Sequence, residues 1–269
     1  MRTFFWPTTV KVVVMLSNIF VKSIRDLRKS TIWWSFGLVL LTVFIQLFYP
    51  SVSSMTEFNE LLTDDSLIKA FIGDVPDLTS PEGYLNSQLF FMMIPLVFII
   101  FSISQGSGAV AGEEEKGTLD LLMSNPLDRW RVVLEKFAAF LLILSALATV
   151  TWLGIIGGAL IVDMEISYVR VAEVTLAAAV LGATFGALAL AIGNATGRRN
   201  LSIAISSGIG VAGYFINALA PVVDLLRVVR KFSPFHYYST SDPLTNGIDF
   251  WHLGTLLSIS FVLIVIAVL

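Results

Sequence analysis

The stretch FAAFLLILSALATVTWLGIIGGALIV, Phe137–Val162, holds no Asp, Glu, Lys or Arg. A helix needs roughly 20 apolar residues to cross a hydrocarbon core of about 30 Å, so this stretch is long enough to span a bilayer. Its apolar residues are continuous rather than alternating, which favours a helix over a strand of a membrane barrel. The stretch therefore predicts a transmembrane helix.

Five further stretches also lack these four residue types. They are Ser30–Thr56, Gly83–Gly112, Val174–Gly197, Asn200–Val223 and Phe250–Leu269. The sequence thus predicts an all-α membrane protein with six transmembrane helices, at about residues 31–50, 84–107, 134–162, 171–194, 200–222 and 250–269. Residues 31–269 would form the transmembrane domain, and residues 1–30 a cytoplasmic tail with an amphipathic interfacial helix.

The composition excludes several classes of protein. Of the 269 residues, 56% are hydrophobic and 14% are charged, and the mean hydropathy is +0.82, which is too apolar for a soluble domain. A formal charge of −3 provides no basic excess to neutralise phosphates, so we expect no nucleic-acid partner. The chain has no cysteine, which excludes disulfides and thiolate metal sites.

The distribution of basic residues predicts the orientation. With the N-terminus in the cytoplasm, 12 of the 17 lysines and arginines lie on the inner side. The outer side receives five, three of them in the cluster Arg227, Arg230 and Lys231. By the positive-inside rule, both termini are expected in the cytoplasm, and the chain is expected to be a multi-pass protein of the plasma (inner) membrane.

The N-terminal segment has the pattern of an interfacial helix. Apolar residues recur at helical spacing at Leu16, Ile19, Phe20, Ile24 and Leu27, and charged residues face the other way. This pattern predicts a helix lying on the cytoplasmic leaflet. A secretory signal is disfavoured because Lys11 interrupts the apolar stretch and no small-residue cleavage site follows.

Two local signals concern individual spans. Ser80 is expected to cap the second span, with Pro81 at the first helical position and Glu82 in the first turn. Gly182 and Gly186 form a Gly-x-x-x-Gly pair in the fourth span. We interpret this pair as close packing within the chain rather than as a dedicated dimer contact.

The chemistry of known membrane enzymes is missing from the sequence. Besides lacking Asp, Glu, Lys and Arg, the six stretches contain a single histidine, His252, and no His-Glu-x-x-His motif occurs. His236 and His252 are expected to belong to an aromatic belt at the membrane surface. No Gly-x-x-x-x-Gly-Lys-Ser/Thr motif occurs either, so we predict no catalytic residue, metal or cofactor in this chain. Energy for active transport would have to come from another polypeptide.

Four polar residues on otherwise apolar spans are candidates for a substrate path. They are Asn86, Gln88, Ser206 and Asn217. The same residue types also form hydrogen bonds between membrane helices, and that interpretation is the more frequent one.

The stretch GEEEKGTLDLLMSNPLDRW, Gly112–Trp130, which we call the connector, joins the second and third spans on the cytoplasmic side. Leu119, Leu122 and Met123 recur at i, i+3 and i+4, which predicts an amphipathic helix at about residues 113–123. An exposed apolar stripe usually marks a contact with another protein. The alternative is a solvated connector whose charges only keep the loop in water.

The connector and its surroundings resemble a known family. AGEEEKGTLDLLMSNPLDRWRVVLEKF is similar to the segment after the second membrane helix of ABC-2 type transporter permeases, with the pattern Gly-Glu-Glu-x-x-Gly-Thr-Leu followed by a Pro and an Arg-rich turn. Supporting likenesses are RDLRKSTIWWSFGL, DLTSPEGYLNSQLF, NATGRR and SPFHYY before DPL. The resemblance covers the chain from about Ser17 onward.

The resemblance implies one half of an exporter. Such a half pairs with a second permease chain, the same or a related one, and with two copies of an ABC ATP-binding subunit that bind ATP and Mg. In this chain the ATPase-coupling residues would be Glu113, Glu114, Glu115, Gly117, Thr118, Leu119 and Leu122, on a cytoplasmic coupling helix. Leu16–Lys29 would match the family's connecting helix. The exported substrate is expected to be amphipathic or hydrophobic, and membrane lipids would surround the helices.

Two alternatives lie outside this class. One is a membrane scaffold or receptor whose cytoplasmic helix recruits some other partner. The other is a channel that works without ATP.

Overall fold

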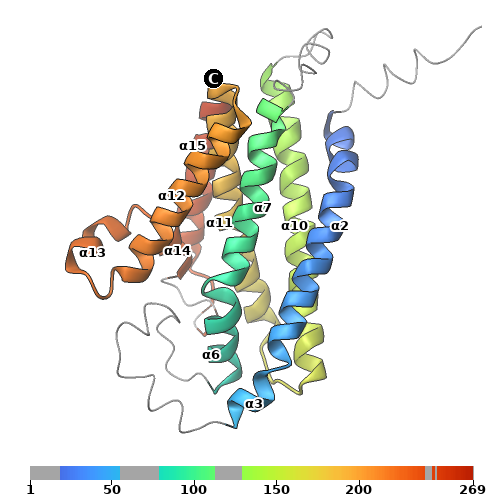
Figure 1. Ribbon diagram of the computed structural model, residues 1–269, viewed down its shortest axis with the longest axis vertical. Coiled ribbons are helices and arrows are strands. Elements are labelled where there is room, and N and C mark those ends of the chain that lie inside the picture. Colours follow the sequence, from blue (N-terminus) through green and yellow to red (C-terminus); the bar gives the residue numbers. More distant parts are fainter. Residues whose placement is uncertain (1–18, 55–78, 113–128, 240–243, 246, 269) are drawn as a thin grey trace, which may run out of the picture.

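The computed structural model describes residues 19–54, 79–112, 129–239, 244–245 and 247–268, and the regular structure within these ranges is helical throughout (Figure 1). Six of the helices are long and apolar enough to cross a membrane. The predicted all-α membrane fold with six spans is therefore confirmed. The predicted coupling helix lies outside the described residues.

The first three spans are α2 (Ile19–Gln46), α6 with η1 and α7 (Pro81–Leu85, Asn86–Phe90 and Met93–Ala109), and α10 (Arg129–Ile161). The others are α11 (Tyr168–Thr196), α12 (Arg199–Leu219) and α15 (Phe250–Val268). Three short helices are α3 (Tyr49–Ser53), α13 (Asp224–Arg230) and α14 (Pro234–Ser239). The start of α2, the end of α7 and the starts of α10 and α12 lie at one end of the bundle, which we call the connector end (Figure 1).

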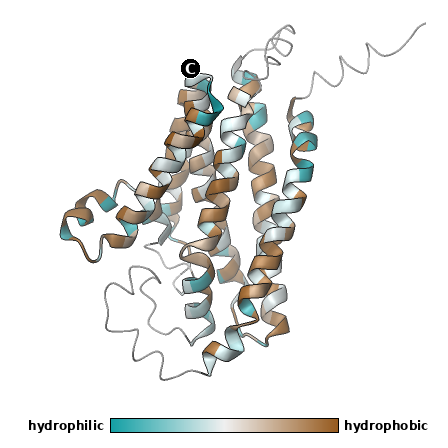
Figure 2. Cartoon of the chain, viewed as in Figure 1, coloured by the Kyte–Doolittle hydropathy of each residue, from teal (hydrophilic) through white to brown (hydrophobic). Residues whose placement is uncertain are grey.

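The fourth span, α11, is the centre of the bundle. It packs against α7, α10, α12 and α15. In its most apolar stretch of 18 residues, 83% of the residues are buried, whereas in the corresponding stretch of α2 only 17% are. Hydrophobic residues run along the spans, and hydrophilic ones gather toward their ends (Figure 2). This pattern is the one expected of a bundle whose outer surface faces lipid.

The contact between α7 and α11 depends on glycine. A Cβ added to Gly106 would overlap the backbone carbonyl of Gly186, and one added to Gly182 would lie 3.1 Å from Ser102 Oγ and 3.2 Å from Phe98 Cβ. Small residues of this kind let membrane helices approach to backbone contact. Gly182 and Gly186 thus pack within the chain, which confirms the interpretation of their spacing.

The first span differs from the expected arrangement. α2 continues without a break from Ile19 to Gln46, so the separate interfacial helix is not confirmed. No Pro or Gly lies between Lys29 and Trp33, and therefore nothing there ends the helix. At 1.5 Å per residue its 28 residues extend about 42 Å, more than the hydrocarbon core, so its charged first turns can lie beyond the membrane on the same axis.

The second span begins as predicted and then changes its helical geometry. The Ser80 side chain accepts a hydrogen bond from the Gly83 backbone N–H at 3.1 Å, and Pro81 is the first helical residue. Five residues later the chain forms a π-helical turn, in which the Phe91 N–H donates to the Asn86 carbonyl at 2.7 Å. Such turns insert one extra residue into a helix.

Gly106→Ala is expected to destabilise the protein, because the new methyl group would force α7 away from α11. Overpacking of this kind costs typically about 1–3 kcal/mol. Gly157→Ala is the matched control, since a Cβ at Gly157 meets nothing within 4 Å. Unfolding temperatures of the detergent-solubilised variants measure the difference. Equal temperatures would contradict the proposed contact.

Candidate functional site

The described chain reaches the connector but does not include its centre. Gly112 is the last described residue before position 129, so all seven predicted coupling residues, Glu113, Glu114, Glu115, Gly117, Thr118, Leu119 and Leu122, lie outside the described residues. What the structure does describe is residues 106–112, the last turn of α7 and the residues after it, which we call the root of the connector. The site is built around this root.

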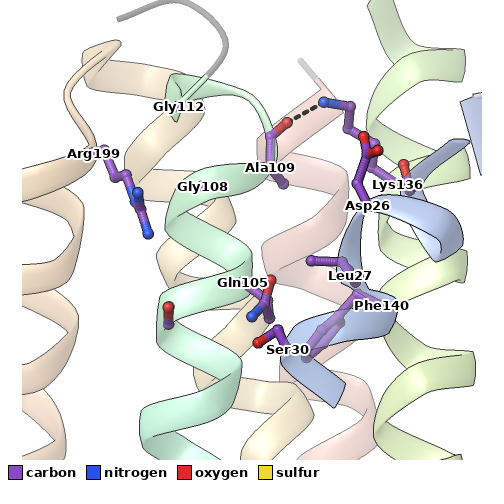
Figure 3. A pocket seen from close by; sticks show the side chains of 12 residues that line it. Asp26, Leu27, Ser30, Gln105, Gly108, Ala109, Gly112, Lys136, Phe140 and Arg199 are labelled. Carbon is purple, nitrogen blue, oxygen red and sulfur yellow. Dashed lines mark hydrogen bonds between the residues drawn. The ribbon is translucent and has the colours of Figure 1, made fainter. Parts of the chain in front are cut away.

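Lys136 of α10 caps the end of α7. Its Nζ donates a hydrogen bond to the Ala109 carbonyl, and the Lys136 side chain is buried, with 8% of its surface exposed (Figure 3). The last carbonyls of a helix have no partner within the helix and carry a partial negative charge. A lysine at this position therefore satisfies a carbonyl and balances the helix dipole.

Arg199 of α12 reaches the same root from the other side. Built on Gly108, a Cβ would lie 3.6 Å from Arg199 Nε, and on Gly112 it would lie 3.8 Å from Arg199 Cδ. The arginine side chain thus lies over the face of the root that carries the two glycines. Arg199 begins α12, where the partial positive charge of the helix disfavours a cation, whereas the end of α7 favours one. The root is thus contacted by cations from the third and fifth spans.

A polar cavity of about 410 Å³ lies beside the root, between α2, α7, α10 and α12 (Figure 3). Three of its residues carry charge, namely Lys136, Arg199 and Asp26. The others are hydroxyl, amide, small or apolar residues: Ser23, Leu27, Ser30, Ser104, Gln105, Gly108, Ala109, Gly112 and Phe140. Its volume is within the roughly 300–1,000 Å³ typical of small-molecule sites.

Residues of α10 also hold the start of α2. The Phe20 N–H donates to Glu135 Oε2 at 3.2 Å, and Arg131 Nε donates to Glu135 Oε1 at 2.7 Å. A carboxylate is favourable near the positive end of a helix. The connector ends of the first, second and third spans are therefore joined through α10.

The four predicted path residues fall on two elements. Asn86 and Gln88 lie in the π-helical turn, where Gln88 is exposed, and Ser206 and Asn217 lie buried on α12. Within the described part of the chain the Ser206 hydroxyl has no hydrogen-bond partner. The two elements approach one another where the Phe91 and Tyr214 rings lie 6.3 Å apart. Their role in a substrate path stays a prediction.

Asn217 forms hydrogen bonds between elements, as the alternative interpretation expects. Its Nδ2 donates to Ser239 Oγ at 3.0 Å, and its Oδ1 accepts from Arg230 Nε at 2.9 Å. These bonds tie α12 to α13 and α14. Burial lowers the pKa of Arg230 from its usual value.

The two histidines lie together where α14 meets the start of α15. The His236 and His252 rings are 6.0 Å apart, Tyr237 lies 5.7 Å from His252, and His252 Nδ1 is 3.5 Å from Asp249 Oδ2. Burial first, and then the charges of Arg230, His252 and Lys231, lower the pKa of His236. Sequence spacing gave no sign that the two histidines meet. Among the described residues no group of three or more His, Asp or Glu could hold a metal ion.

Sequence reasoning also missed the two cations of the root. In the sequence, Lys136 and Arg199 count only among the basic residues of the inner side. The available signal was the spacing of Gly108 and Gly112, which leaves one face of the second span without side chains just before the connector. That signal does not say which residue covers the face.

A comparison with protein families identifies the chain. The family model for ABC-2 family transporter proteins matches residues 17–268. The chain belongs to the ABC-2 transporter family. A search of curated proteins finds no match. Together with the six apolar helices, the family makes this chain a multi-pass membrane subunit of an ABC transporter, a permease rather than an ATPase, and implies an ABC ATP-binding partner.

In this permease, Lys136→Met is expected to loosen the root. Losing a buried hydrogen bond from a charged group costs about 1–3 kcal/mol, so amide hydrogen exchange in residues 106–112 should accelerate by roughly tenfold. Arg131→Met, on the same helix, is the control because its ion pair with Glu135 is exposed and contributes about 0–1 kcal/mol. The same acceleration in both variants would show that Lys136 does not cap α7.

The lowered pKa of His236 predicts a pH dependence of the permease's stability. In the unfolded chain a histidine has a pKa of about 6.5, so just below this pH the unfolded state binds more protons than the folded state. Stability should therefore fall as the pH is lowered from about 6.5. The unfolding temperature between pH 7.5 and pH 5 measures this slope, and His236→Gln should make it shallower. An identical slope in the variant would contradict the lowered pKa.

Proposed function

We propose that this chain is the membrane subunit of an exporter driven by ATP hydrolysis in a separate nucleotide-binding subunit. The observation that carries the proposal is the structure of the connector's root. A segment that receives force from a partner must be attached rigidly to the spans that move. Lys136 bonds the root to the third span, Arg199 of the fifth span lies against it, and glycine packing holds it to the fourth.

The proposed mechanism is a movement of whole helices. Closure of the ATP-binding subunits would push the amphipathic helix at 113–123 of the connector, and the push would pass to α7 through the root. Densely packed interiors transmit such displacement rather than absorbing it. Because Gly106 contacts the backbone of α11 directly, a tilt of α7 would carry the centre of the bundle with it.

The proposed assembly has four chains. Two permease chains, identical or related, would pair in the plasma membrane with cytoplasmic termini, and two ATP-binding subunits would hold ATP and Mg on the cytoplasmic side. The membrane-facing parts of α2 and α12 expose many large apolar side chains, which suits contact with lipid or with a second permease chain: Trp33, Phe36, Leu40, Phe44, Ile205, Ile209, Val211 and Phe215.

The proposed cargo is amphipathic or hydrophobic. The apolar stretches of the six spans contain no Asp, Glu, Lys or Arg, and His252 is their only histidine, so a route along them would suit a molecule that tolerates an apolar lining. Asn86, Gln88, Ser206 and Asn217 would supply its polar contacts. We propose export rather than uptake because the connector resembles that of ABC-2 type permeases, and this resemblance implies an exporter.

Replacing Glu113, Glu114 and Glu115 by alanine is expected to uncouple transport from ATP hydrolysis while the membrane fold is retained. The ATPase rate of the reconstituted complex, with and without candidate apolar compounds, measures coupling. The unfolding temperature measures the fold. The control is Asp163→Asn with Glu165→Ala, which removes two exposed carboxylates from the loop between α10 and α11.

Normal export and normal ATPase stimulation in the triple variant would refute the coupling role. Purification of the permease without any associated ATPase would instead favour a scaffold, a receptor or an ATP-independent channel.

A further inference from the structure

A seam runs between α2 and α7 from the connector end toward the middle of the bundle. α2 packs mainly on α10, and α7 packs mainly on α11, so space remains between α2 and α7. This space has two parts. One is the polar cavity beside the root, and the other is an apolar groove of about 300 Å³.

The two parts follow one another along the same pair of helices. The polar cavity takes its α2 residues from positions 23–30 and its α7 residues from positions 104–109. The apolar groove is lined by Trp33, Trp34, Gly37, Leu38 and Leu41 of α2 and by Val97 of α7. From Asp26 to Leu41 an α-helix rises about 22 Å. The lining of the seam is polar at the membrane surface and apolar toward the middle of the membrane. A phospholipid has the same order, with its headgroup at the surface and its acyl chains toward the middle.

The charges of the polar cavity favour a phosphate. Arg199 and Lys136 supply two positive charges, and Asp26 supplies one negative charge, so the lining is positive by one. Guanidinium and ammonium groups form charge-assisted hydrogen bonds with phosphate oxygens. Basic pockets between membrane helices on the cytoplasmic side bind anionic lipid headgroups. Hydroxyls of Ser23 and Ser30 add neutral donors.

The apolar groove is open to an acyl chain. A Cβ added to Gly37 meets nothing within 4 Å, and Trp33 is 73% exposed. The Trp34 ring of the groove packs edge-on against Phe101 of α7, with centroids 5.8 Å apart. A chain lying beside Gly37 would therefore contact α2 and α7 at once.

We propose that this seam binds a phospholipid of the cytoplasmic leaflet, with its phosphate in the polar cavity that Arg199 and Lys136 line and an acyl chain along Gly37. The lipid would fill the space between the first two spans, next to the root. It is a bound membrane component rather than the exported cargo, so the proposal holds whether or not the connector couples to an ATPase.

The headgroup part is tested by native mass spectrometry of the full-length, detergent-solubilised chain titrated with dioleoylphosphatidylglycerol. Arg199→Gln should raise the Kd about tenfold, because it removes charge-assisted hydrogen bonds to the phosphate. Arg198→Gln is the matched control: it removes the same charge one residue away, and Arg198 does not line the cavity. Equal affinities of the two variants would overturn the headgroup assignment.

The chain part is tested by Gly37→Leu, which places a side chain in the groove at a position where an added Cβ meets nothing within 4 Å. It should weaken phosphatidylglycerol binding several-fold, whereas Gly254→Leu, equally open but on α15, should not. Unchanged binding by Gly37→Leu would overturn the acyl-chain assignment. Because this variant leaves Arg199 in place, it tests the proposal even if the arginine variant does not fold.

Ligands that carry only the chains or only the phosphate show which part of the lipid accounts for binding. Dioleoylglycerol has the chains without the phosphate, and inorganic phosphate and glycerol phosphate have no chains. Each should bind at least tenfold more weakly than phosphatidylglycerol. Equal binding of dioleoylglycerol would show a purely apolar site, and equal binding of inorganic phosphate would show a site for free phosphate. Either result would reject the phospholipid.

Discussion

The close approach of α7 to α11 is the constraint on which the rest of the structure depends. Lipid tails are as apolar as the side chains of the spans, so helices gain stability in a membrane from close van der Waals contact rather than from leaving water. Gly106 and Gly186 allow backbone contact at the connector end of the bundle, and the fully buried Phe98, Phe101 and Phe185 fill the space around it. This contact fixes where α7 ends and hence where the connector begins.

The partial charges at helix ends then determine which charged side chains lie near the end of α7. The end of α7 carries partial negative charge, and it attracts one cation from α10 and one from α12. The start of α2 carries partial positive charge, and Glu135 of α10 lies beside it. These charged residues thus bring the first, second, third and fifth spans together at the connector end.

The sequence predicts the number and type of the spans well, because a helix in lipid must contain about 20 apolar residues and charges interrupt these stretches. The Ser80 cap and the packing of Gly182 are also predictable, since both are local signals. The positions of Lys136, Arg199 and the two histidines are not, because their partners lie far away in the sequence. Lys136 meets a carbonyl 27 residues away, and only the tertiary structure brings His236 to His252.

The π-helical turn in the second span lets one membrane helix serve two different neighbours. The wide turn takes up one residue more than an α-helical turn, so the segment before it faces a direction about 100° from that of an uninterrupted helix. Before the turn, Tyr84 points to the first span and donates to the Ile45 carbonyl at 2.7 Å. After it, Gly106 points to the fourth. The second span therefore consists of two half-helices, one of which faces the first span and the other the fourth.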